Sequence, residues 1–165
     1  MNSFAEFSYK RCVLMYTGYL LLALLALLLT RSGQGIASLW LANALAIALI
    51  YPHPLRHWPV LLGCAALANI SAELLYAGSF SVALYFSISN LLEISIGAAL
   101  LQRYGKVEQL DSDPRALLAV VVRACLLPVI AGATMGAFGL SQLQLGQYGD
   151  LWLIWFASSA TGSLA

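Results

Sequence analysis

The sequence predicts an all-α fold, a polytopic bundle of about six transmembrane helices. Three observations predict it. Of the 165 residues, 61% are hydrophobic and only 9% are charged, against roughly 25% charged residues in soluble domains. The apolar residues form runs close to the ~20 residues that a helix needs to cross a bilayer. Short polar or proline-containing segments separate these runs. This pattern excludes a disordered chain and a soluble globular domain.

Six runs are predicted to span the bilayer. The first carries no charge and lies between Lys10-Arg11 and Arg31. Its apolar stretch is longer than that of a signal peptide and no small-residue cleavage site follows, so we expect it to be retained. The expected spans are residues 12–30, 35–51, 58–77, 80–101, 114–140 and 151–165.

The segments between the spans carry turn signals. A turn with Pro52 and Pro54 ends the second span, because proline interrupts a helix. A tight turn at 78–79 and a polar loop at 102–113 follow, and Asp113 is placed to cap a helix that begins at Pro114. A loop at 141–150 precedes the last span.

The last span is short and has no polar flank. Backbone groups cannot remain unpaired in hydrocarbon. We therefore expect residues 1–165 to form one membrane-embedded domain, the N-terminal part of a longer protein that continues past Ala165.

The distribution of basic residues predicts the orientation. Lys and Arg accumulate in cytoplasmic loops. With the N-terminus in the cytoplasm, the outer side holds only Arg31. The inner side then holds Lys10, Arg11, Arg56, Arg103, Lys106 and Arg115.

Six polar side chains interrupt the spans and are the candidate ligand-binding or signalling residues. They are Asn43, Asn69, Glu73, Asn90, Glu93 and Arg123. A charge at the centre of a membrane helix costs about 2.5–3.5 kcal/mol, so these groups should face the bundle interior, pair or line water. Glu93 and Arg123 lie at matching depth and carry opposite charge, which predicts a buried ion pair between them.

Spacing places these residues on shared helix faces. Asn69 and Glu73 are four residues apart, and Asn90 and Glu93 are three apart. The two polar stripes fit a cavity that is open near Glu73 and holds a small ligand or a proton. They fit equally a set of hydrogen bonds that joins helices without binding anything. Glu73 lies near the outer end of its span and could instead reach the interface and be solvated.

Helix packing is predicted within the fifth span. Gly132 and Gly136 form a GxxxG pattern, and small residues let membrane helices approach closely. The contact is either internal or a homodimer interface. Pro128 is expected to kink the same helix.

Several functions are excluded by what the sequence lacks. Eight Lys and Arg nearly balance seven Asp and Glu, so nucleic-acid binding is unsupported. Cys12, Cys64 and Cys125 are far apart, and His53 and His57 have no third ligand nearby, so no metal or cofactor is expected. The GxSxG, HExxH and P-loop motifs are missing, and we expect no enzymatic activity in this segment.

An ordered set of motifs runs along the chain after residue 34. The motifs are Gly35–Trp40 with Leu41–Asn43, His57–Gly63 with Ala68–Asn69, Ser89–Glu93 with Gly97–Arg103, Pro128 with Gly132–Ala133, Leu151–Trp155, and Gly162. This ordered set resembles the first of the bacterial membrane-associated sensor families, the MASE families. The family often has Pro after the Trp of the second span and an acidic residue where this chain has Ser159.

The resemblance implies an integral-membrane sensory input domain. Such domains precede diguanylate cyclase, phosphodiesterase or histidine-kinase modules and lie in the bacterial inner membrane. It also implies that Trp40, Asn69, Asn90 and Glu93 matter most. We then expect three partners: the lipid bilayer, an unknown small ligand, and a second copy that dimerises through the part after Ala165.

Two other functions fit the same spans. One is the solute-binding membrane subunit of an energy-coupling transporter, which would use the same Asn and Glu residues. The other is a purely structural anchor that dimerises an enzyme.

Overall fold

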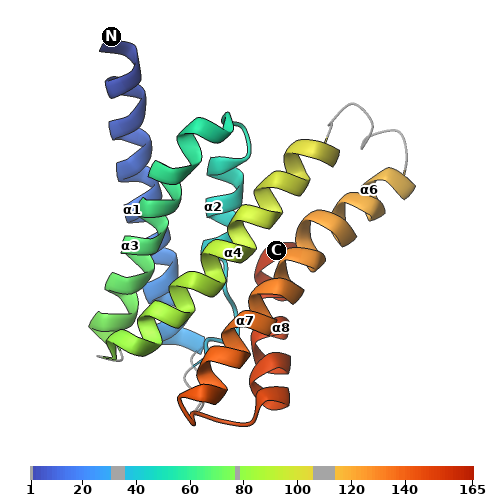
Figure 1. The fold of residues 1–165 in the computed structure, drawn as a ribbon. Coiled ribbons are helices and arrows are strands. Elements are labelled where there is room, and N and C mark those ends of the chain that lie inside the picture. The colour runs from blue at the N-terminus through green and yellow to red at the C-terminus, as the bar shows by residue number, and fades with distance from the viewer. Residues whose placement is uncertain (1, 31–35, 77–78, 106–113) are drawn as a thin grey trace.

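The computed structural model describes residues 2–30, 36–76, 79–105 and 114–165, and the described part of the chain contains helices and no strands. Expectations that fall on 31–35, 77–78 and 106–113, including the Asp113 cap and the sites of Arg31 and Lys106, lie outside it. Figure 1 shows the helices as rods that run up and down one another with the N-terminus at one end of the bundle.

Four helical segments are long and apolar enough to cross a membrane. They lie within α1 (Asn2–Thr30), in the short helix Leu55–His57 with α3 (Trp58–Tyr76), in α4 (Phe80–Tyr104), and in the run from α6 (Pro114–Val120) to α7 (Leu127–Gln142). The membrane class is therefore confirmed, whereas six full-length spans are not.

The two remaining helices are shorter than expected. α2 covers only Ala42–Ile50, because residues 36–41 approach it as non-helical backbone, and α8 covers Tyr148–Leu164. The described part of the second predicted span is thus non-helical backbone followed by a helix. Non-helical backbone at membrane depth is tolerated where other helices bury it, and Ile36, Ala37 and Trp40 are all buried.

The fifth predicted span is one rod of three helical segments, a π-helix between two α-helices. Between α6 and α7 the chain forms a π-helix, η2 (Val121–Leu126), just before Pro128. Pro128 has no N–H to donate to the carbonyl four residues earlier. The turn widens here, and the Leu127 N–H bonds to the Val122 carbonyl five residues back. The irregularity next to Pro128 is thus a π-helix, a feature at which helices often bend.

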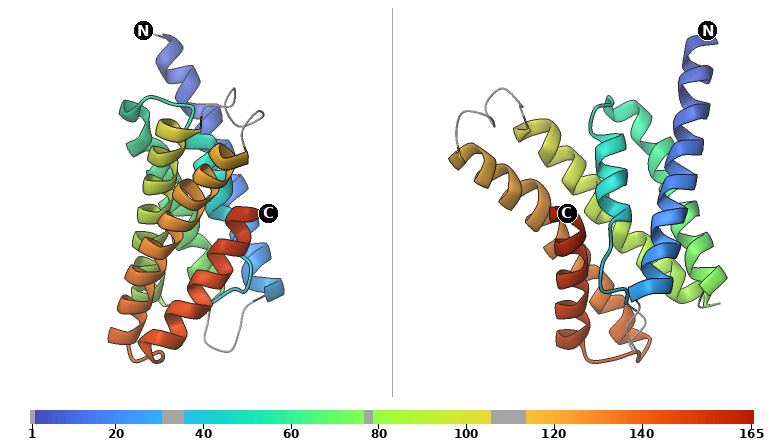
Figure 2. Two further views of the ribbon diagram at one scale, coloured as in Figure 1. Left: turned by 90° about the vertical axis from the view of Figure 1, so that its right-hand side faces the viewer. Right: turned by 180° about the vertical axis from the view of Figure 1, so that it is seen from behind.

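α4 is the central helix. It packs on α2 and α3 on one side and on α7 on the other, and α7 packs on α8. Figure 2 shows α1, α2 and α3 gathered on one side of α4, and α7 with α8 on the other. The apolar core is divided in the same way. One cluster joins α1 to α4, and the other joins Phe86 to α7 and α8.

The turn between α2 and α3 is fixed from two directions. The Trp58 indole Nε1 donates to the His53 carbonyl at 3.0 Å. The Gln102 amide at the end of α4 donates to the carbonyls of Tyr51 and His53 at 2.6 and 2.7 Å. These bonds hold α4 against the turn and so fix the height of its polar residues.

Candidate functional site

The three membrane-embedded asparagines meet in one buried network. Asn43 on α2 accepts hydrogen bonds through Oδ1 from the Tyr19 hydroxyl of α1, at 2.8 Å, and from the Trp40 indole, at 3.2 Å. Its Nδ2 donates to Asn90 Oδ1 on α4 at 3.1 Å. All four side chains are at most 5% exposed. The network therefore lies in the interior of the bundle.

The network continues across α4 to α3. Asn90 Nδ2 donates to Asn69 Oδ1 at 3.4 Å, and Asn69 Nδ2 donates to Ser87 Oγ at 2.9 Å. Each asparagine thus accepts from one side and donates to the other. Bonds aligned in this way polarise one another and strengthen together.

Trp40 determines the direction of the whole chain. An indole N–H can only donate, so Asn43 must turn its oxygen toward Trp40 and its nitrogen toward Asn90. The same requirement then passes to Asn90 and Asn69 in turn. A change in the position of Trp40 would therefore alter the orientation that each amide in the network prefers.

The backbone at Trp40 is also tied to α8. The Trp40 N–H donates to the Ser158 carbonyl at 3.3 Å. Gly162, one turn later on α8, lies directly against the Trp40 carbonyl, where a Cβ atom would collide with backbone. The non-helical segment before α2 thus joins the polar network to α8.

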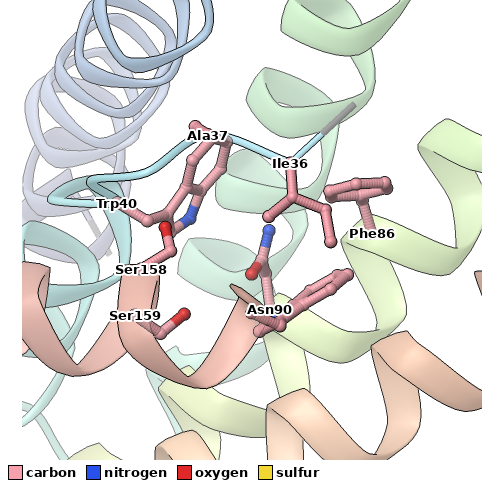
Figure 3. A pocket seen from close by; sticks show the side chains of 8 residues that line it. Ile36, Ala37, Trp40, Phe86, Asn90, Ser158 and Ser159 are labelled. Atoms are coloured by element: carbon pink, nitrogen blue, oxygen red, sulfur yellow. The ribbon is translucent and has the colours of Figure 1, made fainter. Parts of the chain in front are cut away.

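A small cavity lies at this junction. Its lining comes from three parts of the fold, as Figure 3 shows: the segment before α2, α4 and α8. The lining residues are Ile36, Ala37, Trp40, Phe86, Asn90, Trp155, Ser158 and Ser159. The centre of a water molecule can move over about 10 Å³, which is room for about one water. The hydroxyls of Ser158 and Ser159 and the Asn90 amide supply polar partners.

Glu93 lies next to the network and is completely buried. It is one helical turn beyond Asn90 on α4, and the side chains of Asn43 and Ser159 face its carboxyl group. Neither carboxyl oxygen has a hydrogen-bond partner in the described structure. Gly132 on α7 leaves the space for it, since a Cβ atom there would approach Glu93 Oε2 to 2.8 Å.

The predicted Glu93–Arg123 ion pair does not form. Arg123 is exposed, and its guanidinium lies 4.8 Å from the centre of the Tyr104 ring. Counting residues along a span gives the depth of a side chain but not the direction it faces. The π-helix around Arg123 adds to the error, because its wider turns shift the faces of the residues that follow.

The other candidate residues have simpler surroundings. Glu73 is completely buried on α3, so it is not solvated at the outer interface. Gly136 is buried against the Trp155 ring of α8, and its GxxxG partner Gly132 packs on α4. These contacts are internal to the chain. Pro128 is buried at the start of α7.

His53 and His57 lie close together outside the spans, with ring centres 6.3 Å apart. Burial and the nearby Arg11 side chain lower the pKa of His53, so its neutral form is favoured. Arg11 donates to the His53 ring. The residues that the structure describes hold no group of three metal-ligating side chains.

Sequence reasoning missed three contributors to the site. Tyr19, Ser87 and Ser158 are all buried and polar within apolar runs. The only signal in the sequence is a hydroxyl in an otherwise apolar span, which is too common to single out a residue. Ser159 appeared only as a departure from the family pattern, yet it faces Glu93.

Comparison with known proteins identifies the family. A family model for MASE1 matches residues 11–165. The chain belongs to the MASE1 family. MASE1 is a membrane sensor domain and not a catalytic one, and with the apolar helices this makes the chain a multi-pass membrane domain.

A curated protein is similar to most of this chain. The chain is 27% identical over 146 residues to a protein of Escherichia coli (strain K12) described as a probable diguanylate cyclase, DgcE. The match covers 86% of this chain and 13% of that protein. No solved structure matches the chain.

Proposed function

We propose that this MASE1 domain is a sensory input domain whose cue acts on the buried asparagine network and changes the position of α8. The observation that carries the proposal is the direct link from the network to α8 through Trp40. The indole of Trp40 directs the amides, and its backbone bonds to Ser158. A cue that moves one end of this path has a route to the other.

The cue is a small molecule or a change in the membrane. A ligand shifts the balance between two arrangements only through its different affinity for each. The cavity beside Asn90 has room for about one water in the present arrangement, so a larger ligand would have to open it. Trp40, Asn69, Asn90, Glu93 and the neighbouring Glu73 are the proposed binding or signalling residues.

The output is a cytoplasmic signalling module attached after α8. The relative's name, a probable diguanylate cyclase, supports synthesis of cyclic di-GMP as one such output. A phosphodiesterase and a histidine kinase remain the alternatives that the family resemblance implies.

The same proposal places the protein in the bacterial inner membrane with its N-terminus in the cytoplasm. The end of the bundle that carries the N-terminus also carries the start of α3, the end of α4 and the start of α6 (Figure 1). These are the positions of Arg56, Arg103 and Arg115, and an excess of basic residues favours the cytoplasmic side.

The test uses the full-length protein with its own output module. Asn90→Ala breaks the network at its centre, and Ser81→Ala changes an exposed polar residue on the same helix. We expect the first variant to change the regulated output and the second to leave it unchanged. The product measured is cyclic di-GMP if the module is a cyclase.

A third protein in that test replaces residues 1–165 with an unrelated membrane anchor of the same oligomeric state. The proposal predicts that regulation is lost while the output module remains active. Retained regulation would mean that the domain is only an anchor and would overturn the proposal.

A further inference from the structure

Glu93 is an acidic residue in the interior of the bundle that the structure describes. It is 0% exposed, and neither of its carboxyl oxygens accepts or donates a hydrogen bond there. It lies where four helices meet, since it is on α4, Gly132 of α7 packs on it, and Asn43 of α2 and Ser159 of α8 face it. An isolated carboxylate in such a place costs several kcal/mol.

Among the described residues, no basic side chain lies close enough to Glu93 to neutralise a carboxylate. Of the ionisable side chains around Glu93, Tyr19 of α1 and Glu73 of α3 are not basic. On η2, Arg123 lies over the Tyr104 ring, and Cys125 is a half-buried thiol.

The helices that contact Glu93 add no base. α2 and α7 contain no ionisable residue, and those of α8 are Tyr148 and Asp150 in its first turn. Compensation for the charge must therefore come from outside the described residues.

A metal cation fits the neighbours poorly. The Asn43 oxygen already accepts from Tyr19 and Trp40, so Asn43 can turn only an amide hydrogen toward Glu93. That leaves the Ser159 hydroxyl as an oxygen ligand from a facing side chain. One carboxyl and one hydroxyl are far from the six or more oxygens that a hard cation such as Ca²⁺ takes.

We propose that Glu93 is a proton-binding site and that its loading with a proton controls the attachment of α8. The inference rests on the proposed sensory function and names a proton as the ligand of that site. The geometry that carries it is the junction of Glu93, Gly132, Asn43 and Ser159.

The protonated and deprotonated forms of Glu93 differ in how strongly the carboxyl group accepts hydrogen bonds. With the proton bound, the group is neutral and makes no strong demand on its neighbours, which matches the absence of hydrogen bonds to it. When the proton leaves for a water molecule, giving a carboxylate and a hydronium ion, the carboxylate accepts from the remaining Asn43 amide hydrogen and the Ser159 hydroxyl. Charge-assisted hydrogen bonds are the stronger kind, so α2 and α8 are drawn to α4.

The cavity offers a path for the proton. Ser159 is part of its lining (Figure 3). The same side chain faces Glu93. A single water in the cavity would lie beside Ser159 and could pass a proton to or from the carboxyl group.

Infrared spectroscopy of the full-length protein in membranes tests the site directly. A protonated carboxyl group has a C=O stretching band that its carboxylate lacks. We expect a band that disappears as the pH is raised, that is missing in Glu93→Gln and that remains in the control variant Asp150→Asn, which changes an exposed acidic residue of α8. A band unaffected by Glu93→Gln, or a Glu93 band that never changes with pH, would overturn the inference.

If Glu93→Gln does not fold, a second variant still tests the inference. Ser159→Ala removes the hydroxyl that faces Glu93, so the Glu93 band and its pH midpoint should shift. An unchanged band and midpoint would show that Glu93 and α8 are not coupled.

The two proposals fail in different ways. If the band titrates but the domain can be replaced by an unrelated anchor without loss of regulation, the sensory function fails and the proton site stands. If regulation needs the domain but no Glu93 band titrates, the proton site fails and the sensory function stands.

Discussion

The two sides of α4 are held together by different kinds of contact. Toward α1, α2 and α3 the contacts include a continuous series of side-chain hydrogen bonds through three asparagines. Toward α7 and α8 they are glycines against side chains and aromatic rings against one another. Gly132 packs on Glu93, and Phe86 stacks on Trp155 with ring centres 4.7 Å apart.

The difference separates a fixed region, made of α1 to α4, from a region that can adjust, made of α7 and α8. Membrane helices gain nothing from hydrophobic burial against lipid, so hydrogen bonds and close packing must hold them. Hydrogen bonds between amides are directional and specify one arrangement. Contacts of small residues and rings are less directional, and α8 reaches the first region mainly through Trp40 and the cavity. We therefore regard α8 as the element that a cue would move.

The largest expected effect is at the contact between the regions. Gly162→Ala would push a methyl group into the Trp40 carbonyl, which is backbone and has little freedom to shift. We expect a loss of roughly 3 kcal/mol in the free energy of unfolding, at the upper end of overpacking costs. Unfolding in mixed micelles with increasing sodium dodecyl sulfate measures it.

A matched control for this variant is Gly63→Ala on α3. No atom lies within 4 Å of the Cβ position there, so the change should be neutral or slightly stabilising. Equal destabilisation by both variants would mean that the contact of Gly162 with Trp40 is unimportant.

The next effect concerns the fixed region. Asn43→Ala removes three hydrogen bonds, those to Tyr19, Trp40 and Asn90. Side-chain hydrogen bonds between membrane helices average about 0.6 kcal/mol each, which gives a loss of about 2 kcal/mol in the same measurement. Ser89→Ala is the control, because the Ser89 hydroxyl bonds only to the Tyr85 carbonyl of its own helix. A comparable loss for both would show that the network does not hold the region together.

A smaller change isolates one bond of the network. Tyr19→Phe deletes the hydroxyl that donates to Asn43 at 2.8 Å and keeps the ring. We expect a loss of about 0.6 kcal/mol and no effect on amide direction, since Trp40 still donates to the same oxygen. Hydrogen-exchange protection of the Asn43 and Asn90 side chains, followed by NMR, reports this directly. Loss of protection at Asn90 would contradict the role given to Trp40.

The smallest effect is expected at Arg123. Its side chain is exposed and lies over Tyr104, so Arg123→Ala should change the free energy of unfolding by less than about 0.5 kcal/mol. A buried ion pair with Glu93 would instead cost roughly 3–5 kcal/mol when broken. The same micelle titration separates the two outcomes. A large loss in the free energy of unfolding would indicate that the ion pair between Glu93 and Arg123 forms after all.

Much of the fold could be predicted from the sequence because a chain that crosses lipid can adopt few backbone conformations. Backbone groups in hydrocarbon must bond within helices, so long apolar runs predicted α3, α4 and the α6–α7 rod nearly at their observed bounds. The end of α1 was also predicted, but this helix begins at Asn2, ten residues before the predicted span. The second run was misjudged because composition does not show where a buried chain leaves the helix, and residues 36–41 are extended in part to carry Trp40 to α8.

The sequence by itself determined the membrane class, the polar residues that must avoid lipid, and their depth, because these follow from hydropathy and a fixed rise per residue. Only the tertiary structure decided which of them meet. Asn43, Asn69 and Asn90 come together, Arg123 turns away, and Glu93 remains without a partner in the described structure. The direction a side chain faces depends on helix rotation, and rotation is set by packing against neighbours that are distant in the sequence.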